Sequence, residues 1–242
     1  MRLAAFRTTF RQPSARAPHR TSCLQPTMEG ATPRLTISPA LLPPGAKGLV
    51  FDCDGTLVDS MPQHLKAWQH TCAVHGLTPM TAELMVELAG KPVHELLDVV
   101  AEQSGKASHQ VDRLAFFDTK GRFYVDNHSP AQVIEATLDI VRAGAAAGLP
   151  MAVASGGSRA HVLQGLTETG ILHYFQAVVC AEDVTNGKPA PDGFLLAAEK
   201  LGVAPEFCVG YEDAKLGMEA ITAAGFMAAV DVTVLPNYPH LV

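Results

Sequence analysis

Two carboxylates stand two residues apart at the end of an apolar run, in the segment FDCDGTLVDS (Phe51 to Ser60). Because strand side chains alternate with a period of two, Asp52 and Asp54 leave the same face of the strand end. Like charges this close raise each other's pKa unless a cation neutralises them. The pair therefore needs a shared proton or a divalent metal, and carboxylate oxygens suit Mg²⁺. A capped D-G-T turn would explain one aspartate after an apolar run, but it explains two poorly.

Three further motifs each follow a short apolar run. SGGS (Ser155–Ser158) places a hydroxyl and glycine amides at the start of an expected helix, which is typical of an anion site. Taken alone, it equally fits a turn with an N-cap serine. Lys188 lies in the loop GKPAPD, where a lone lysine is usually solvated. Glu212 and Asp213 follow the run FCVG, where acidic residues also simply stabilise a helix N-terminus.

Short apolar runs bounded by Gly, Pro, Asn or Asp predict strands that are buried on both faces of a parallel sheet. They cover Lys47–Cys53, Leu149–Ala154, Gln176–Cys180, Phe207–Gly210 and Phe226–Asp231. Segments of helical period lie between them, at Gln132–Ala147, Ser158–Thr169, Pro191–Leu201 and Ala214–Ala224. A glycine that can form a left-handed C-cap follows each helix, namely Gly148, Gly170, Gly202 and Gly225. This alternation predicts an α/β fold with a doubly wound, Rossmann-like parallel sheet.

One interval interrupts the alternation, because residues 61–129 contain helical patterns and no convincing strand. The expected helices are Pro62–His75, Thr81–Ala89, Val93–Ser104 and Ser108–Asn127. The interval is far longer than an ordinary crossover. We therefore expect a helical cap domain at 61–129, inserted into an α/β core formed by residues 47–60 and 130–242. The insertion leaves the carboxyl end of a strand, where open α/β sheets bind ligands, and two linkers near Asp59–Pro62 and His128–Pro130 would let the cap close.

The first 46 residues have a different composition from the rest. They carry six Arg, no Lys, one acid (Glu29) and seven of the 17 prolines, which gives a net charge of +5. Arginines interleaved with Ser and Thr, without an apolar core segment, are typical of an organelle transit peptide, and a disordered tail is the alternative. We expect a chloroplast or mitochondrial protein, or a cytoplasmic one if translation starts at Met28.

The remaining 196 residues carry a net charge of −11. They contain no basic patch with interleaved aromatics, so we expect no nucleic-acid partner. No run of 18 apolar residues is present, so we expect no membrane span. The five cysteines lack C-x-x-C spacing, which favours free thiols in a reducing compartment over a disulfide framework or a zinc site. We expect a monomer.

The four motifs together resemble a known family. FDCDGTLVDS resembles the first motif of the haloacid dehalogenase superfamily, and SGGS is similar to the second. GKPAPD (Gly187–Asp192) resembles the third and GYEDAKLGMEA (Gly210–Ala220) the fourth. The resemblance covers roughly residues 47–232. With a helical insertion after the first motif, the chain is similar to the branch of sugar phosphatases and β-phosphoglucomutases that carry helical caps.

The resemblance implies a role for each motif residue. Asp52 would be the nucleophile that forms an aspartyl-phosphate. Asp54 would be the general acid and base, with a pKa that we expect the neighbouring carboxylates to raise. Ser155 and Gly156 would bind the phosphate. Lys188 would bridge Asp52 and the phosphate, and would offset the negative charge of the transition state.

The resemblance also implies a Mg²⁺ site. Asp52, Asp213 and the main-chain carbonyl of Asp54 would be ligands, with Glu212 in contact directly or through water.

The cap would select the substrate. His64 and Trp68 are one helical turn apart and share a face beside the expected site, although the same spacing is typical of a packed helix face. In related capped enzymes a histidine at this place lies near the sugar phosphate. The segment AGKPVH resembles the family's substrate-specificity loop, so Lys91 and His94 would reach a second anionic or polyhydroxyl group.

The implied function is a Mg²⁺-dependent phosphatase that acts on a small phosphorylated metabolite, such as a hexose or fructose 1-phosphate. The alternative is a β-phosphoglucomutase, which returns the phosphoryl group to the sugar. That family tends to carry Val where this chain has Thr56, which favours hydrolysis. Because Asp52, Asp54, Lys188 and Asp213 are all present, a non-catalytic binding module is disfavoured. Asp54 also argues against a dehalogenase, since a departing halide needs no proton.

Overall fold

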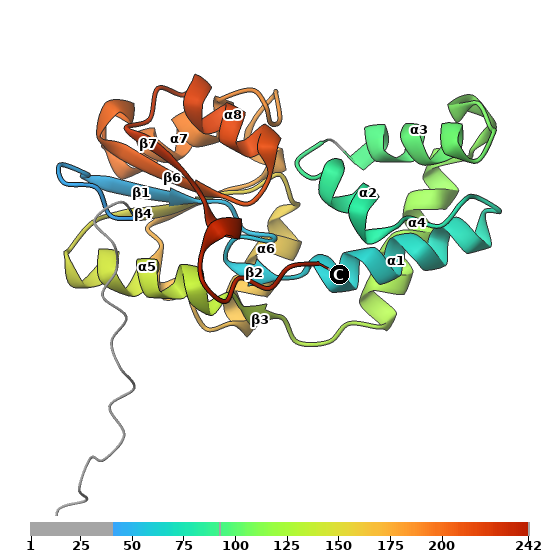
Figure 1. Ribbon diagram of the computed structural model, residues 1–242, viewed down its shortest axis with the longest axis horizontal. Helices are drawn as coiled ribbons and strands as arrows, with labels where there is room; N and C mark the ends of the chain where they lie inside the picture. The colour runs from blue at the N-terminus through green and yellow to red at the C-terminus, as the bar shows by residue number, and fades with distance from the viewer. Residues whose placement is uncertain (1–40, 92, 242) are drawn as a thin grey trace, which may run out of the picture. The chain divides into compact units, whose positions relative to one another are not determined.

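The computed structural model describes residues 41–91 and 93–241 (Figure 1). The transit peptide or tail expected at 1–46 lies largely outside these residues. Five strands form one parallel sheet in the order β5-β4-β1-β6-β7. They are β1 (Gly48–Phe51), β4 (Met151–Ala154), β5 (Ala177–Val179), β6 (Cys208–Glu212) and β7 (Ala228–Asp231).

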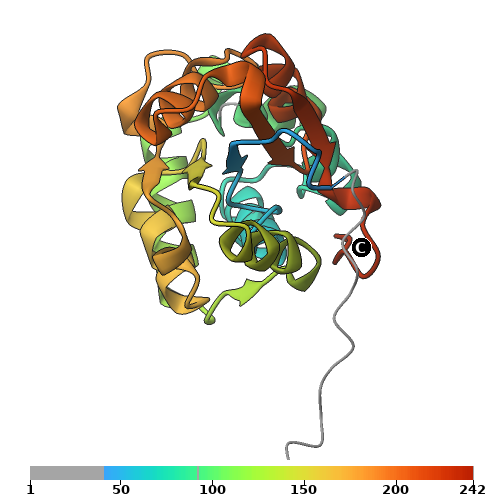
Figure 2. The ribbon, with the colours of Figure 1, turned by 90° about the vertical axis from the view of Figure 1, so that its left-hand side faces the viewer.

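Helices cover both faces of this sheet (Figures 1 and 2). One face packs against α5 (Glu135–Ala146) and α6 (Arg159–Glu168), and the other against α7 (Asp192–Leu201) and α8 (Lys215–Ala223). Successive residues of β1 point to opposite faces, as the period of two requires, and all of them are fully buried. Leu49 and Phe51 join the cluster on the α5–α6 side, whereas Val50 joins Phe194 and Ile221 on the α7–α8 side. The predicted doubly wound fold is confirmed.

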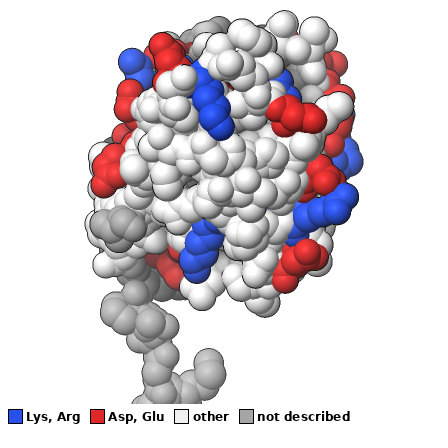
Figure 3. Space-filling model, turned by 90° about the vertical axis from the view of Figure 1, so that its right-hand side faces the viewer, with Lys and Arg blue, Asp and Glu red and all other residues white. Residues whose placement is uncertain are grey.

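The cap contains α1 (Met61–Val74), α2 (Ala82–Glu87), α3 (Val93–Gln103) and α4 (Arg113–Asp126). It has a hydrophobic cluster of its own, in which Trp68, Met80, Leu97 and Phe116 are almost fully buried. On the face over these helices, basic and acidic side chains are interspersed around a broad uncharged area (Figure 3). Among the described residues, no helix is long and apolar enough to cross a membrane.

Short 3-10 helices occupy several of the connections. They are Ser108–Gln110, Leu172–Tyr174, Ala181–Asp183, Pro205–Phe207 and Val232–Val234. The first of them interrupts the single helix that the sequence predicts over Ser108–Asn127. Asp112 then caps α4, since its carboxylate accepts a hydrogen bond from the amide of Ala115.

The core helices follow the predicted pattern with one correction. The four glycines expected after them have φ between 66° and 73°, the left-handed conformation of a C-cap. The helix predicted from Gln132 starts only at Glu135. Gln132–Val133 forms β3, which pairs antiparallel with β2 (Val58–Asp59). A strand of two residues carries no periodic signal, so sequence patterns miss it.

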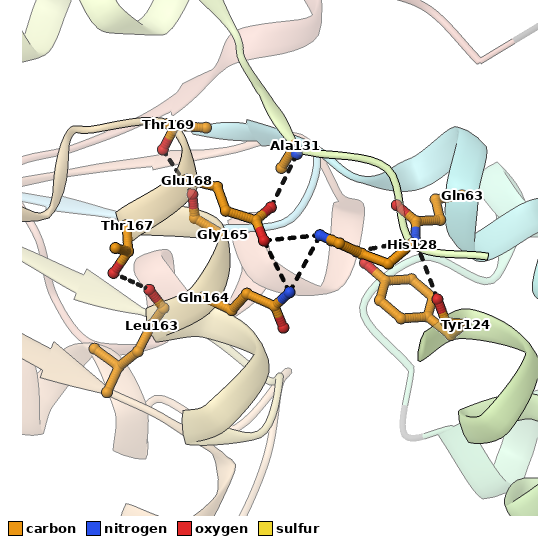
Figure 4. Close-up of polar contacts among 10 residues, drawn as sticks. All are labelled: Gln63, Tyr124, His128, Ala131, Leu163, Gln164, Gly165, Thr167, Glu168 and Thr169. Carbon is orange, nitrogen blue, oxygen red and sulfur yellow. Dashed lines mark hydrogen bonds and ion pairs between the residues drawn. The ribbon is translucent and has the colours of Figure 1, made fainter. Parts of the chain in front are cut away.

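The β2–β3 pair joins the two linkers between cap and core, and a polar cluster lies beside it (Figure 4). Glu168 of α6 accepts hydrogen bonds from His128 Nε2 (2.7 Å), the amide of Ala131 (3.0 Å) and Gln164 Nε2 (2.8 Å). Gln63 of the cap lies 3.2 Å from His128 Nδ1. One carboxylate of the core therefore holds the second linker, next to the first cap helix. Rigid-body closure of the cap stays a prediction.

Replacing Glu168 with Ala should loosen this linker, because the carboxylate that three donors share is removed. We expect proteinase K to cleave the chain between residues 127 and 131 several-fold faster, as measured by mass spectrometry of the fragments. Thr167→Ala is the matched control, since the Thr167 hydroxyl donates to Leu163 within α6. Equal cleavage rates in both variants and the wild type would show that Glu168 does not restrain the linker.

Candidate active site

The carboxyl end of the central strand places Asp52 beside the acidic pair that follows β6. The amide of Asp52 donates to the carbonyl of Tyr211 (2.9 Å), which extends the pairing of β1 with β6 by one residue. Each of Asp52, Glu212 and Asp213 offers a carboxylate oxygen, and these atoms lie within 4.8 Å of one another. Adjacent parallel strands thus bring together residues that are 160 positions apart in the sequence.

Lys188 is the cation of this cluster. It lies in the loop before α7, and its Nζ donates to Asp52 Oδ1 (2.5 Å) and to Glu212 Oε1 (2.7 Å). Asp52 is 6 % exposed and Glu212 only 1 %. Lys188 therefore pairs with two buried carboxylates, and with Asp213 beside them the cluster has an excess of negative charge.

The pKa values follow from burial together with that excess. Burial and the charge of Glu212 raise the pKa of Asp52 to about 7, although Lys188 acts to lower it. Burial, Glu212 and Asp52 raise the pKa of Asp213 well above its ordinary value. Burial would lower the pKa of Lys188, but the carboxylates of Asp52 and Glu212 outweigh it and hold this pKa above its usual range. A divalent cation bound by these oxygens would balance the charge, and an all-oxygen donor set fits Mg²⁺.

Close contacts fix the positions of the acidic pair. The Thr56 hydroxyl donates to Asp213 Oδ1 (2.8 Å). Glu212 Oε2 accepts from the amides of Asp213 (2.7 Å) and Ala214 (3.3 Å), just before α8 begins. A Cβ atom at position 217 would lie 1.5 Å from Glu212 Oε1, so only glycine at this position leaves room for the carboxylate.

Asp54 lies in a different environment from Asp52. Its Oδ1 accepts hydrogen bonds from Ser60 Oγ (2.5 Å) and His161 Nε2 (2.9 Å), and His64 Nε2 lies 4.0 Å away. Burial would raise the pKa of Asp54, but the hydrogen bond and charge of His161, with His64 and Ser60, hold it well below its usual range. The rise that we expected from neighbouring carboxylates is therefore wrong. The histidines that face Asp54 determine the direction of the shift instead.

The SGGS loop lies next to the other oxygen of Asp54. Ser155 follows β4 and is buried, and its Oγ accepts from the amide of Gly157 (3.0 Å). A Cβ atom at position 157 would lie 3.2 Å from Ser155 Oγ and 3.3 Å from Asp54 Oδ2. Gly156 is exposed. The loop therefore meets Asp54 on the side where Oδ2 lies.

The expected cap at the start of α6 differs in one detail. Ser158 occupies the N-cap position, but its side chain makes no capping hydrogen bond. The carboxylate of Glu182 accepts from the amide of Arg159 instead (3.0 Å).

The cap residues predicted for substrate binding fall into two groups. His64 reaches the site, where it stacks on Tyr124 and lies 4.0 Å from Asp54 Oδ1. Trp68 packs in the interior of the cap, as the alternative interpretation had it. Lys91 and His94 are exposed, and they are not among the described residues that contact Asp52 or Asp54. Their role in binding stays a prediction.

Comparisons with known proteins agree with this geometry. Residues 46–225 match the family described as "Hydrolase: haloacid dehalogenase-like hydrolase". The chain is 38% identical to the fructose-1-phosphate phosphatase YqaB of Escherichia coli over 190 residues, which cover 78% of this chain and 97% of that protein. It is 34% identical to hexitol phosphatase A of Escherichia coli over 184 residues, covering 74% and 80% of the two chains.

The chain belongs to the haloacid dehalogenase-like hydrolases. Its fold is also similar to the crystal structure of β-phosphoglucomutase from Clostridium difficile, with a TM-score of 0.66 at 23% identity over 76% of this chain and 83% of that one. In this haloacid dehalogenase-like hydrolase, the four motifs meet at the carboxyl ends of β1, β4 and β6 and in the loop before α7. It is an enzyme with the site of a phosphatase.

Sequence reasoning missed several residues of this hydrolase's site. Ser60, Lys120, Tyr124 and His161 all lie near Asp54, and they come from α1, α4 and α6 or their starts. Burial lowers the pKa of Lys120 to about 8, partly offset by the charge of Asp54, and its Nζ lies over the ring of Trp68. Of these residues, only His161 could have been suspected from the sequence, because it lies in the first turn of the helix that follows the SGGS motif.

The C-terminal segment is a further feature that the motifs did not predict. The Tyr238 hydroxyl donates to the carbonyl of Gly55 (2.7 Å). A cavity of about 220 Å³ lies beside it, lined by Gly55 and Asp213 of the hydrolase core and by Val86 and Ala89 of the cap. One edge of the carboxylate cluster therefore adjoins a space between core, cap and C-terminal segment.

Binding of Mg²⁺ to this hydrolase should release protons, with an affinity that rises with pH. In the cation-free protein the pKa of Asp52 is about 7, so the carboxyl is protonated below that pH and a metal must displace the proton. We expect the Kd for Mg²⁺ to increase up to about tenfold per pH unit below 7 for each proton displaced. Isothermal titration calorimetry at pH 6 and pH 8, in buffers of different ionisation enthalpy, measures both quantities. A Kd that is constant between these pH values, with no proton release, would contradict the prediction.

Proposed function

We propose that this enzyme is a Mg²⁺-dependent phosphatase that hydrolyses a sugar phosphate through an aspartyl-phosphate on Asp52. The observation that carries the proposal is the environment of Asp52. Its carboxylate is buried, and one oxygen is held by Lys188, which leaves Oδ2 outside that hydrogen bond. A fixed, partly neutralised carboxylate is suited to attack a phosphoryl group.

In the first step, an oxygen of Asp52 attacks phosphorus and the bond from phosphorus to the sugar oxygen breaks. Asp54 supplies the proton that the departing oxygen needs, because the negative charge of the bound phosphate favours the protonated carboxyl against the donors that hold its pKa low in the free site. The proton is held on Oδ2, since Oδ1 accepts the hydrogen bonds of Ser60 and His161. Lys188 offsets negative charge on Asp52 and on the phosphoryl oxygens.

In the second step, water attacks phosphorus of the aspartyl-phosphate and the bond from phosphorus to Asp52 breaks. Asp54, now ionised, takes a proton from that water, and inorganic phosphate leaves. Ser155 and the amides of its loop bind the phosphoryl oxygens in both steps.

Mg²⁺ would be held by Asp52 and Asp213 with the main-chain carbonyl of Asp54, and Glu212 would contact it directly or through water. When bound, it would neutralise the charge shared by the phosphate and the carboxylates. The excess of carboxylates over cations in the cluster supports this assignment.

The substrate that we propose is a fructose 1-phosphate or a closely related hexose or hexitol phosphate. The 38% identity to YqaB, which covers nearly all of that protein, supports this class. Near Asp54 the cap provides an imidazole, a phenol and an ammonium group, from His64, Tyr124 and Lys120. Such groups suit a polyhydroxylated ligand. Lys91 and His94 would reach its far end once the cap has closed. We further propose that the enzyme acts as a monomer in a plastid or mitochondrion.

Phosphate release from a panel of sugar phosphates tests the proposal. We expect fructose 1-phosphate or a hexose phosphate to be hydrolysed with Mg²⁺, and the rate to fall at least a thousandfold with a chelator. Asp52→Asn should abolish turnover, because the amide is a poor nucleophile. Adding a sugar bisphosphate and assaying for isomerised sugar separates the alternative, β-phosphoglucomutase.

The outcomes are distinct. Isomerised sugar without free phosphate would replace the phosphatase with the mutase. Activity that survives Asp52→Asn would show that the nucleophile is a different residue.

A further inference from the structure

The imidazole of His161 lies at a place where nothing in the four motifs requires a histidine. It comes from the first turn of α6, in the core, and its Nε2 lies 2.9 Å from Asp54 Oδ1. Asp54 is 107 positions away in the sequence. Since an ionised carboxylate only accepts hydrogen bonds, His161 Nε2 is the donor.

The hydrogen bonds to Asp54 are asymmetric. Ser60 and His161 both donate to Oδ1, and His64 also approaches that oxygen, at 4.0 Å. Oδ2 lies instead on the side of the SGGS loop, close to the position that a Cβ at residue 157 would occupy. Donors on one oxygen fix the rotation of the carboxyl group about its Cβ–Cγ bond. They also make Oδ2 the oxygen that carries a proton whenever the carboxyl is protonated.

The two residues that donate to Asp54 Oδ1 belong to different elements of the structure. Ser60 lies on the same chain segment, six residues on, where the first linker enters α1. His161 belongs to a separate element of the core and is itself held in an aromatic cluster, with ring centroids 5.1 Å from His64 and 5.4 Å from Tyr124. Its side chain therefore has one well-defined position when the cap lies over the core.

We propose that His161 is a positioning residue for the general acid: it holds Asp54 Oδ1 so that Oδ2 presents its proton to the leaving oxygen of the substrate. The proposal rests on the phosphatase function proposed above. His161 acts through Asp54 and does not itself exchange a proton with the substrate. The contribution of His161 to kcat/KM should therefore be large when the departing oxygen needs a proton and small when it does not.

A series of substituted phenyl phosphates of similar size, with leaving groups from 4-nitrophenol to phenol, tests this directly. The quantity to measure is kcat/KM, which reports the steps up to release of the phenol. In His161→Ala, we expect kcat/KM for phenyl phosphate to fall at least tenfold. For 4-nitrophenyl phosphate it should change less than twofold. The plot of log kcat/KM against leaving-group pKa should thus become steeper.

Two further variants complete the experiment. His161→Gln keeps a donor at a similar distance along the side chain, and it should restore most of the wild-type slope. His173→Ala, which removes an exposed histidine of the same core, should leave the slope unchanged. Circular dichroism and thermal unfolding establish that each variant is folded.

The results separate the two claims. An active wild type whose slope is the same in His161→Ala would overturn the role of His161, and so would an equal fall for every ester. A wild type that hydrolyses no phosphomonoester would overturn the proposed function, and the role of His161 with it.

Discussion

The structure depends on one electrostatic constraint: three carboxylates must lie together at the carboxyl edge of a buried parallel sheet. Lys188 makes this possible by donating to both Asp52 and Glu212. The surrounding residues adapt to the same constraint. Gly217 leaves room for the Glu212 side chain, Thr56 donates to Asp213, and the amides at the start of α8 donate to Glu212. One ammonium group against three carboxylates leaves a net negative charge, which suits a cation and the chemistry of a phosphoryl group.

The two aspartates of the first motif share a strand end but have separate environments. Burial and the charge of Glu212 raise the pKa of Asp52 to about 7, whereas at Asp54 the histidines and Ser60 outweigh burial and hold the pKa below its usual range. Two groups of the same type thus acquire different properties from their neighbours. The cap helps to determine the environment of Asp54, because it contributes His64 and Tyr124 to the cluster around this carboxylate.

The sequence was sufficient to predict those helices and strands that have a local sequence pattern. Apolar runs located the five core strands, and the glycines after the helices marked their ends. The residues that meet at Asp52 could be named because the four motifs resemble those of the haloacid dehalogenase superfamily; position alone would have left Lys188 as a solvated lysine. The contacts around Asp54 could not be predicted in this way. His161, Lys120 and Tyr124 approach it from other elements, and only the packing of cap against core determines which side chains face it. The strands β2 and β3 were missed because two residues show no period.

Phosphorylation of Asp52 can be detected by acid quenching followed by mass spectrometry. The Asp54→Asn variant should be mixed with acetyl phosphate and Mg²⁺, because that leaving group needs no proton and the variant lacks the base that activates water. We expect one phosphoryl group to accumulate on the peptide containing Asp52. It should be absent when Asp52 is also replaced by Asn. A phosphoryl group on any other residue, or none on Asp52 while phosphate is still released, would show that Asp52 is not the nucleophile.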